Sequence, residues 1–222
     1  NVSAKTLAIN GLSEGDDVNL YVYPSQQSDV TVSWTDGTGT KNTNQQTLEA
    51  NRVSVIDLGS VPKSATGLTI SATEPVTAAA KVTSDGDGDQ ADFALVNASV
   101  PMNVSAMAVP DHATAQVSVT NTSDDDRTAT LTSYNGDGDI VEQSDLAIRA
   151  GASTTIELAD INDGDVAAVS LADPDQSMVW NIRVSQKDVS DAKLAGVSII
   201  SATDLKEARE QVWSNQNMTI VH

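Results

Sequence analysis

Alternating carboxylates are the feature of this 222-residue sequence most suggestive of chemistry. They form the run Asp85-Gly86-Asp87-Gly88-Asp89, and Asp92 follows closely. A calcium ion takes oxygen ligands at alternate positions of a flexible loop, so Asp85, Asp87 and Asp89 are the candidate metal ligands. The fit to an EF-hand loop is poor, because Gln90 stands where glycine is required and Val96 where the bidentate glutamate is required. We therefore expect no cofactor and interpret the run as a solvated acidic linker, with calcium binding as the alternative.

The side chains that most often perform catalysis are scarce. Cysteine is absent and the histidines are His112 and His222, which excludes thiol catalysis and cysteine-based zinc sites. Ser60-x-x-Lys63 and Ser190-x-x-Lys193 have the spacing of the nucleophile pair of penicillin-recognising enzymes, but the companion motifs of that family do not occur. The sequence also has no nucleophile elbow, phosphate loop or dinucleotide fingerprint. These absences favour a protein that is not an enzyme.

Charge limits the partners. The chain has 12 basic and 31 acidic residues, a formal net charge of −19, and a pI near 4.1. Such a chain repels phosphate groups, so we expect neither nucleic acid nor an anionic membrane surface as a partner. The longest uncharged stretch, Phe93 to Pro110, is interrupted by polar residues and cannot span a bilayer. The sequence begins at Asn1 without a leader, so we expect a processed or excised chain, and an anchor could precede Asn1.

Aromatic residues suggest a second kind of site. Trp34, Trp180, Tyr21 and Tyr23 could together form a platform on which sugar rings stack. A tryptophan on a strand of a sandwich is more often a core residue. We therefore expect core positions, with Trp34 and Trp180 as the large side chains of two cores, and keep the sugar platform as the alternative.

The elements that would position these residues are short strands. Apolar and small polar residues alternate, as half-buried antiparallel strands require, in segments 30–34, 53–55, 68–72, 117–119, 129–131 and 166–171. Between strands stand the turn dipeptides Asp36-Gly37, Asn135-Gly136, Asp137-Gly138 and Asp163-Gly164. About seven short strands in about 100 residues are typical of an immunoglobulin-like sandwich.

The pattern repeats after about 100 residues. Matching segments are Ile56-Asp57-Leu58 with Ile156-Glu157-Leu158, Ala80-Lys81-Val82-Thr83 with Ile182-Arg183-Val184-Ser185, and Leu95 to Val100 with Leu194 to Ile199. We predict an all-β protein of two tandem immunoglobulin-like antiparallel β-sandwich domains, residues 1–104 and 105–201. Residues 202–222 are predicted to form a short C-terminal helix and tail, because Leu205, Ala208 and Val212 would share one helical face.

Three segments resemble those of uncharacterised secreted or membrane-anchored envelope proteins of actinobacteria. They are Asn-Gly-Asp-Gly at 135–138, Ile-Arg-Ala-Gly-Ala-Ser-Thr-Thr-Ile-Glu-Leu at 148–158, and Glu-Pro-Val-x-Ala-Ala at 74–79. The resemblance covers residues 30–200 and transfers no catalytic residue. It implies an extracytoplasmic pair of domains that faces the cell wall. We therefore expect a non-enzymatic cell-envelope module with a structural role or with a protein or glycan partner; the alternative is a carbohydrate-binding or calcium-stabilised adhesion module.

Overall fold

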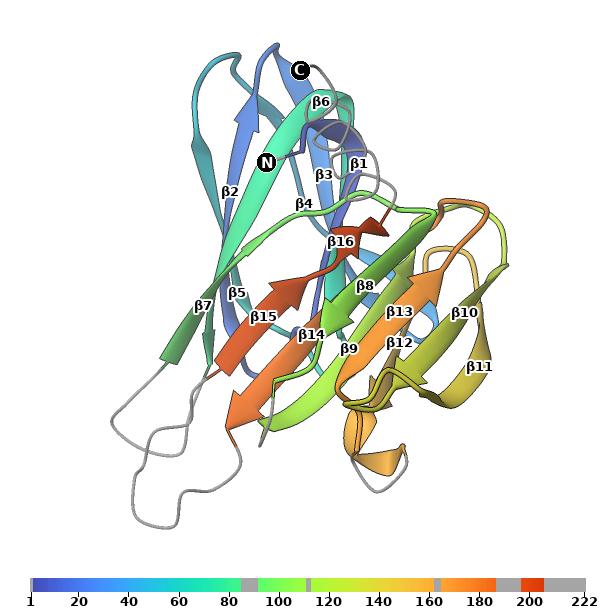
Figure 1. The fold of residues 1–222 in the computed structure, drawn as a ribbon. Coiled ribbons are helices and arrows are strands. Elements are labelled where there is room, and N and C mark those ends of the chain that lie inside the picture. Colours follow the sequence, from blue (N-terminus) through green and yellow to red (C-terminus); the bar gives the residue numbers. More distant parts are fainter. Residues whose placement is uncertain (1, 85–91, 111–112, 162–164, 187–196, 206–222) are drawn as a thin grey trace, which may run out of the picture.

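The structure, a computed structural model, describes residues 2–84, 92–110, 113–161, 165–186 and 197–205. Most of these residues lie in antiparallel strands arranged in two sandwiches (Figure 1), which confirms the predicted fold class. Within the described ranges, no helix has the length and apolar character needed to cross a membrane. The predicted turn at Asp163-Gly164 and most of the predicted C-terminal helix lie outside the described residues.

Strands β1 to β7 form the N-terminal sandwich. They are β1 (Ala4–Asn10), β2 (Asp17–Pro24), β3 (Ser28–Asp36), β4 (Gly39–Leu48), β5 (Ser54–Ser60), β6 (Gly67–Ser84) and β7 (Asp92–Asn97). One layer has the order β4-β3-β6-β1, and the other has the order β5-β2-β6-β7. Strand β6 belongs to both layers, because its first half pairs with β1 and β3 and its second half with β2 and β7.

Strands β8 to β16 form the C-terminal sandwich. They are β8 (Val104–Ala108), β9 (Ala113–Asn121), β10 (Arg127–Tyr134), β11 (Ile140–Ile148), β12 (Ser153–Glu157), β13 (Ala168–Ala172), β14 (Met178–Gln186), β15 (Val197–Ser201) and β16 (Thr203–Asp204). A 3-10 turn, η1 (Leu158–Asp160), follows β12. The layers are β11-β10-β13-β8-β16 and β12-β9-β14-β15. Thr203–Asp204, placed by prediction in the helical tail, are instead a strand, because they pair with the open edge of β8.

Both sandwiches have the same order of strand pairing. Ile56 on β5 pairs with Leu20 on β2, and Ile156 on β12 pairs with Val117 on β9. The predicted match of Leu95–Val100 with Leu194–Ile199 is wrong. Leu95 pairs with Lys81, whereas it is Ile199 that pairs with Arg183, so Leu95 corresponds to Ile199. The sequence match failed because the connection before β15 is longer than the connection before β7.

The sandwiches differ where the chain passes from one layer to the other. In the C-terminal sandwich, a turn separates β13 from β14, and the buried Asp173 carboxylate accepts the backbone N–H groups of Ser177 and Met178, both at 2.6 Å. In the N-terminal sandwich β6 continues through Pro75, which has no N–H to donate. There Ser28 Oγ accepts the N–H of Glu74 at 3.0 Å and donates to its carbonyl at 3.2 Å.

Each sandwich has its own hydrophobic core between its layers. Trp34 lies in the first core and Trp180 in the second, both buried, as predicted. Trp180 Nε1 donates to Ser105 Oγ at 2.7 Å, which satisfies the one polar group of that ring. The two tryptophans are therefore not available for a surface platform.

A buried polar junction joins the sandwiches. Asn10, at the end of β1, is fully buried; its backbone N–H donates to Asn181 Oδ1 at 2.9 Å and its side-chain amide donates to the Val179 carbonyl at 2.9 Å. Arg183 donates to both carboxylate oxygens of Asp16, at 2.6 and 3.1 Å. Satisfied polar networks of this kind fix one relative geometry, because any shift leaves buried groups without partners.

Candidate functional site

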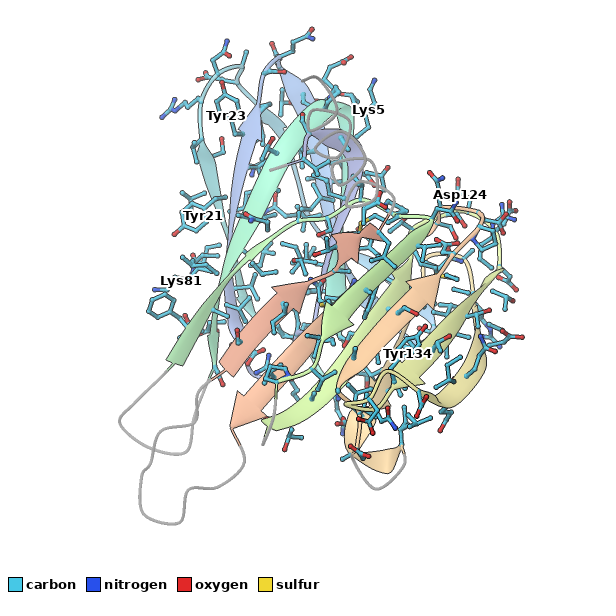
Figure 2. All side chains as sticks on the ribbon, in the orientation of Figure 1. Lys5, Tyr21, Tyr23, Lys81, Asp124 and Tyr134 are labelled. Atoms are coloured by element: carbon cyan, nitrogen blue, oxygen red, sulfur yellow. The ribbon has the colours of Figure 1, made fainter. Side chains whose placement is uncertain are left out.

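One outer sheet surface of the N-terminal sandwich carries large apolar side chains. It is formed by the outward-facing positions of β5, β2, the second half of β6 and β7, together with Val53 immediately before β5, and we call it the open face. Exposed fractions are 71% for Leu95, 58% for Val55, 57% for Val53, 55% for Phe93, 41% for Tyr23 and 38% for Tyr21. These are six of the nine large hydrophobic side chains that are exposed in the described part of the chain. In Figure 2, Tyr21, Tyr23 and Lys81 lie on the left, and the C-terminal sandwich lies on the right.

The alternation of each strand produces this surface. Along β2, Val18, Leu20 and Val22 are buried, so Tyr21 and Tyr23 must face the other side. The same rule applies to β7, where Ala94 and Val96 fill the core and Phe93 and Leu95 face outward. Because the smaller apolar side chains of β7 face the core, its two bulkier side chains, Phe93 and Leu95, face solvent.

Cross-strand register brings these residues together. Tyr21 pairs with Val55 on β5 and with Ala79 on β6. β7 lies on the side of β6 away from β2, and there Lys81 on β6 pairs with Leu95 on β7. The Lys81 ammonium lies 5.2 Å from the centre of the Phe93 ring. That distance is within the range of a cation–π interaction, so Lys81 and Phe93 support each other at the edge of the face.

Some of the polar groups on the open face have partners within the sandwich. Tyr23 Oη donates to Asn51 Oδ1 at 3.2 Å, which ties the ring to the turn before β5. Asp17 accepts from Ser60 Oγ at 2.7 Å, and Asp57 accepts the N–H of Gly59 at 3.0 Å. Two carboxylates and one ammonium leave this surface close to neutral, in contrast to the net charge of −19 of the whole chain.

A cleft lies at the junction of the sandwiches. This cleft has a volume of about 320 Å³ and is lined on the N-terminal side by hydroxyl side chains, those of Thr6, Thr31, Ser33, Thr40, Thr69 and Ser71. On the opposite wall stands Asp124, which is labelled in Figure 2. The lining contains no aromatic ring. Hydroxyl groups alone exchange water hydrogen bonds for ligand hydrogen bonds of similar strength, so the cleft offers less binding energy than the open face.

In the described residues, no group of three or more His, Asp or Glu side chains could hold a metal ion. The two buried carboxylates have structural partners: Asp16 is paired with Arg183, and Asp173 accepts backbone N–H groups. Neither faces the cleft or the open face as a free acid or base.

The predicted metal ligands cannot be placed. Asp85, Asp87 and Asp89 lie outside the described residues, as does His112. The related run Asn135-Gly136-Asp137-Gly138-Asp139 is a hairpin turn, in which Asn135 Oδ1 accepts the N–H groups of Asp137 at 3.1 Å and Asp139 at 2.9 Å. The hairpin between β3 and β4 is similar: Asp36 Oδ1 accepts from the N–H and hydroxyl of Thr38 at 2.7 and 2.6 Å.

These contacts have an electrostatic effect at one position. The Thr38 hydroxyl, followed by the Thr38 and Gly39 backbone N–H groups, holds the pKa of Asp36 below its ordinary value, against a small opposing effect of burial. The group therefore remains a carboxylate to lower pH, as a turn-forming hydrogen-bond acceptor should.

Sequence reasoning found only part of the candidate surface. Tyr21 and Tyr23 were expected in a core or a platform, and they are exposed. Phe93, Leu95 and Lys81 were not recognised as candidates. The available signal was the segment Phe-Ala-Leu-Val at 93–96, where bulky and small apolar residues alternate and so cannot all face one core.

Comparison with known protein families identifies the family to which this chain belongs. Residues 1–159 match the family of unknown function DUF5719, and because this match spans more than half of the chain, the chain belongs to that family. No curated protein matches the sequence. Among solved structures, the crystal structure of PBSX exported protein XepA is similar, with a TM-score of 0.29 and 11% identity over 81% of this chain and 84% of that chain.

Proposed function

We propose that this member of the DUF5719 family is a non-enzymatic extracytoplasmic module of the cell envelope that binds a protein or glycan partner through the open face. The observation that carries the proposal is the gathering of Tyr21, Tyr23, Val53, Val55, Phe93 and Leu95 on one sheet surface. Monomeric proteins rarely leave contiguous apolar patches in water, and those that do usually bind something there.

The chemistry of the described residues supports a binding role over an enzymatic one. Catalysis by side chains needs a nucleophile or an acid–base pair in a cleft. Here the buried carboxylates Asp16 and Asp173 hold the backbone and the junction together, and the open face presents hydrocarbon and aromatic surface. The extracytoplasmic location is supported by the resemblance of segments 74–79, 135–138 and 148–158 to actinobacterial envelope proteins.

A carbohydrate-binding module is the second candidate, and the two tyrosines favour it. Tyr21 and Tyr23 lie on the same face of β2, two positions apart, which places their Cα atoms about 7 Å apart. Aromatic rings in such a row can stack on the apolar faces of successive sugar rings. Hydrogen-bonding side chains stand beside them, because Asn19 is also on β2 and Thr77 pairs with Tyr23.

A matched set of variants tests the open face. Wild-type protein, Tyr21→Ser/Tyr23→Ser and Leu95→Asn are compared on a glycan array and in pull-downs from envelope extract of the source cells. The control is Ile140→Asn, because Ile140 is similarly exposed, at 60%, but lies on the C-terminal sandwich. We expect binding that both open-face variants lose and the control retains. Equal binding by all four proteins would contradict the proposal.

Two further assays test the other parts of the proposal. A hydrolase screen on cell-wall polysaccharides and generic esters is expected to show no turnover, and turnover abolished by a single Asp→Asn change would overturn the non-enzymatic role. Labelling of intact source cells with a membrane-impermeant amine reagent should modify the protein. Protection in intact cells combined with labelling after lysis would contradict an exposed extracytoplasmic location.

A further inference from the structure

The two sandwiches carry the same sequence of residue types across corresponding outer sheets. In the C-terminal sandwich, one row across β12, β9, β14 and β15 consists of Glu157, Gln116, Arg183 and Ile199. In the N-terminal sandwich, the corresponding row across β5, β2, β6 and β7 consists of Asp57, Asn19, Lys81 and Leu95. Each row has a carboxylate, an amide, a cation and a branched aliphatic side chain in the same order.

In the C-terminal sandwich this row is a docking surface. Arg183 donates to the Gly11 carbonyl at 2.9 Å and to the Asp16 carboxylate, both in the turn that follows β1 of the other sandwich. Ile199 is 7% exposed and packs into the core of the N-terminal sandwich. Gly11 has a φ of +79°, and a Cβ there would lie 3.3 Å from Ile199, so the turn fits closely against this row. The cation binds an acidic turn, and the aliphatic side chain packs beside it.

In the N-terminal sandwich the corresponding row is part of the open face. Leu95 is 71% exposed, whereas its counterpart Ile199 is buried. The Lys81 ammonium lies 5.2 Å from the centre of the Phe93 ring, which also belongs to the open face. The residues that hold one sandwich to another inside the chain are thus repeated on a surface that meets solvent.

The next two rows on the same side of the sheet show how a partner docked on the open face must differ from the turn that docks inside the chain. Ser118 and Thr120, which are buried in the junction, correspond to Tyr21 and Tyr23 on the open face. Small side chains let the internal partner approach the backbone closely, while the tyrosine rings hold a partner further away and supply apolar contact area instead.

We propose that the open face docks a second copy of this chain, with Lys81 receiving a carboxylate from an acidic turn of that copy and Leu95 packing beside it. The proposal rests on the proposed function, because it names the partner of the same surface. The occupant is argued from the interface already present, in which a sandwich of this fold covers the same row. Every copy also supplies exposed acidic turns, at Asp124–Asp126 and at Asp137 and Asp139.

The test measures the mass of the full chain by sedimentation equilibrium and light scattering, over protein concentrations up to about 1 mM, a range that detects even weak association. Because two copies with a net charge of −19 repel each other at long range, the series is repeated at about 0.15 and 0.5 M salt, where that repulsion is screened. The proteins are the wild type, Leu95→Asn, Lys81→Ala, and the matched control Ile140→Asn.

We expect concentration-dependent dimers of the wild type and the control, and dimerisation weakened by about tenfold or more in Leu95→Asn and Lys81→Ala. Circular dichroism establishes that each variant is folded. A wild type that remains a monomer throughout, or dimers unaffected by both substitutions, would overturn the inference. A monomer that binds a glycan through Tyr21 and Tyr23 would overturn it while leaving the proposed function intact, whereas no binding of any kind at the open face would contradict both.

Discussion

Replacing Arg183 by alanine is the sharpest test of how the two sandwiches are held together. The substitution removes both hydrogen bonds to Asp16, at 2.6 and 3.1 Å, while the Asp16 side chain is only 3% exposed. Loss of one member of a buried ion pair costs about 3–5 kcal/mol, because the remaining charge stays buried without compensation. For a chain of about this length, 1 kcal/mol corresponds to about 2–4 °C in Tm, so we expect Tm to fall by about 6–20 °C.

Calorimetry is the assay, because it also reports how the sandwiches unfold. We expect one transition in the wild type and separated transitions in Arg183→Ala, since the junction no longer couples the two cores. The control is Arg52→Ala, which breaks the exposed pair of Arg52 and Glu49 (3.2 Å) and should cost less than about 1 kcal/mol. The double variant Asp16→Leu/Arg183→Met should recover part of the loss, because it removes both charges. Equal effects of the Arg183 and Arg52 substitutions would refute this account of the junction.

Three further outcomes are expected. Gly67→Ala should destabilise the protein by about 1–3 kcal/mol in urea unfolding, because its Cβ would lie 2.8 Å from a backbone oxygen of β1, whereas Gly136→Ala, with no atom within 4 Å, should change stability little. An NMR titration should find the Asp36 pKa below its ordinary value and raised by Thr38→Val; because the folded-state pKa is the lower one, its contribution to stability is present above the unfolded-state pKa and is lost as pH falls through the folded-state pKa. Calcium should raise Tm no more than an equal ionic strength of another salt, and a saturable rise at micromolar calcium would show that the protein binds the ion and would contradict the expectation for Asp85, Asp87 and Asp89.

Local patterns in the sequence predicted the strands well. The alternating segments at 30–34, 117–119 and 129–131 lie within β3, β9 and β10, and the turn dipeptides at Asp36-Gly37 and Asn135-Gly136 lie in hairpins between paired strands. These features depend on neighbours in sequence: a period of two determines a strand, and residues that tolerate tight turns determine a hairpin.

The surfaces could not be predicted in the same way. Alternation assigns residues to two sides of a strand but does not determine which side faces the core. The sequence pattern is therefore equally consistent with Phe93 and Leu95 being buried or exposed. The junction depends on contacts between residues far apart in the chain, such as Asp16 with Arg183. The residues around Asp16 and those around Arg183 form no local pattern that predicts this contact. The sequence marks Arg183 only as a cation within a repeated strand, and its partner Asp16 lies 167 positions away in the other sandwich.

Strand β6 gives the N-terminal sandwich an unusual mechanical character. Its 18 residues have a contour length of about 60 Å, pass from one layer into the other within one strand, and are hydrogen-bonded to four other strands. A pulling force on this segment is shared by four strand ladders, two in each layer. In the C-terminal sandwich the corresponding residues form two separate strands, β13 and β14, joined by the Asp173 turn. A pulling force can therefore act on one layer before the other. We therefore expect the N-terminal sandwich to resist tension better than the C-terminal one.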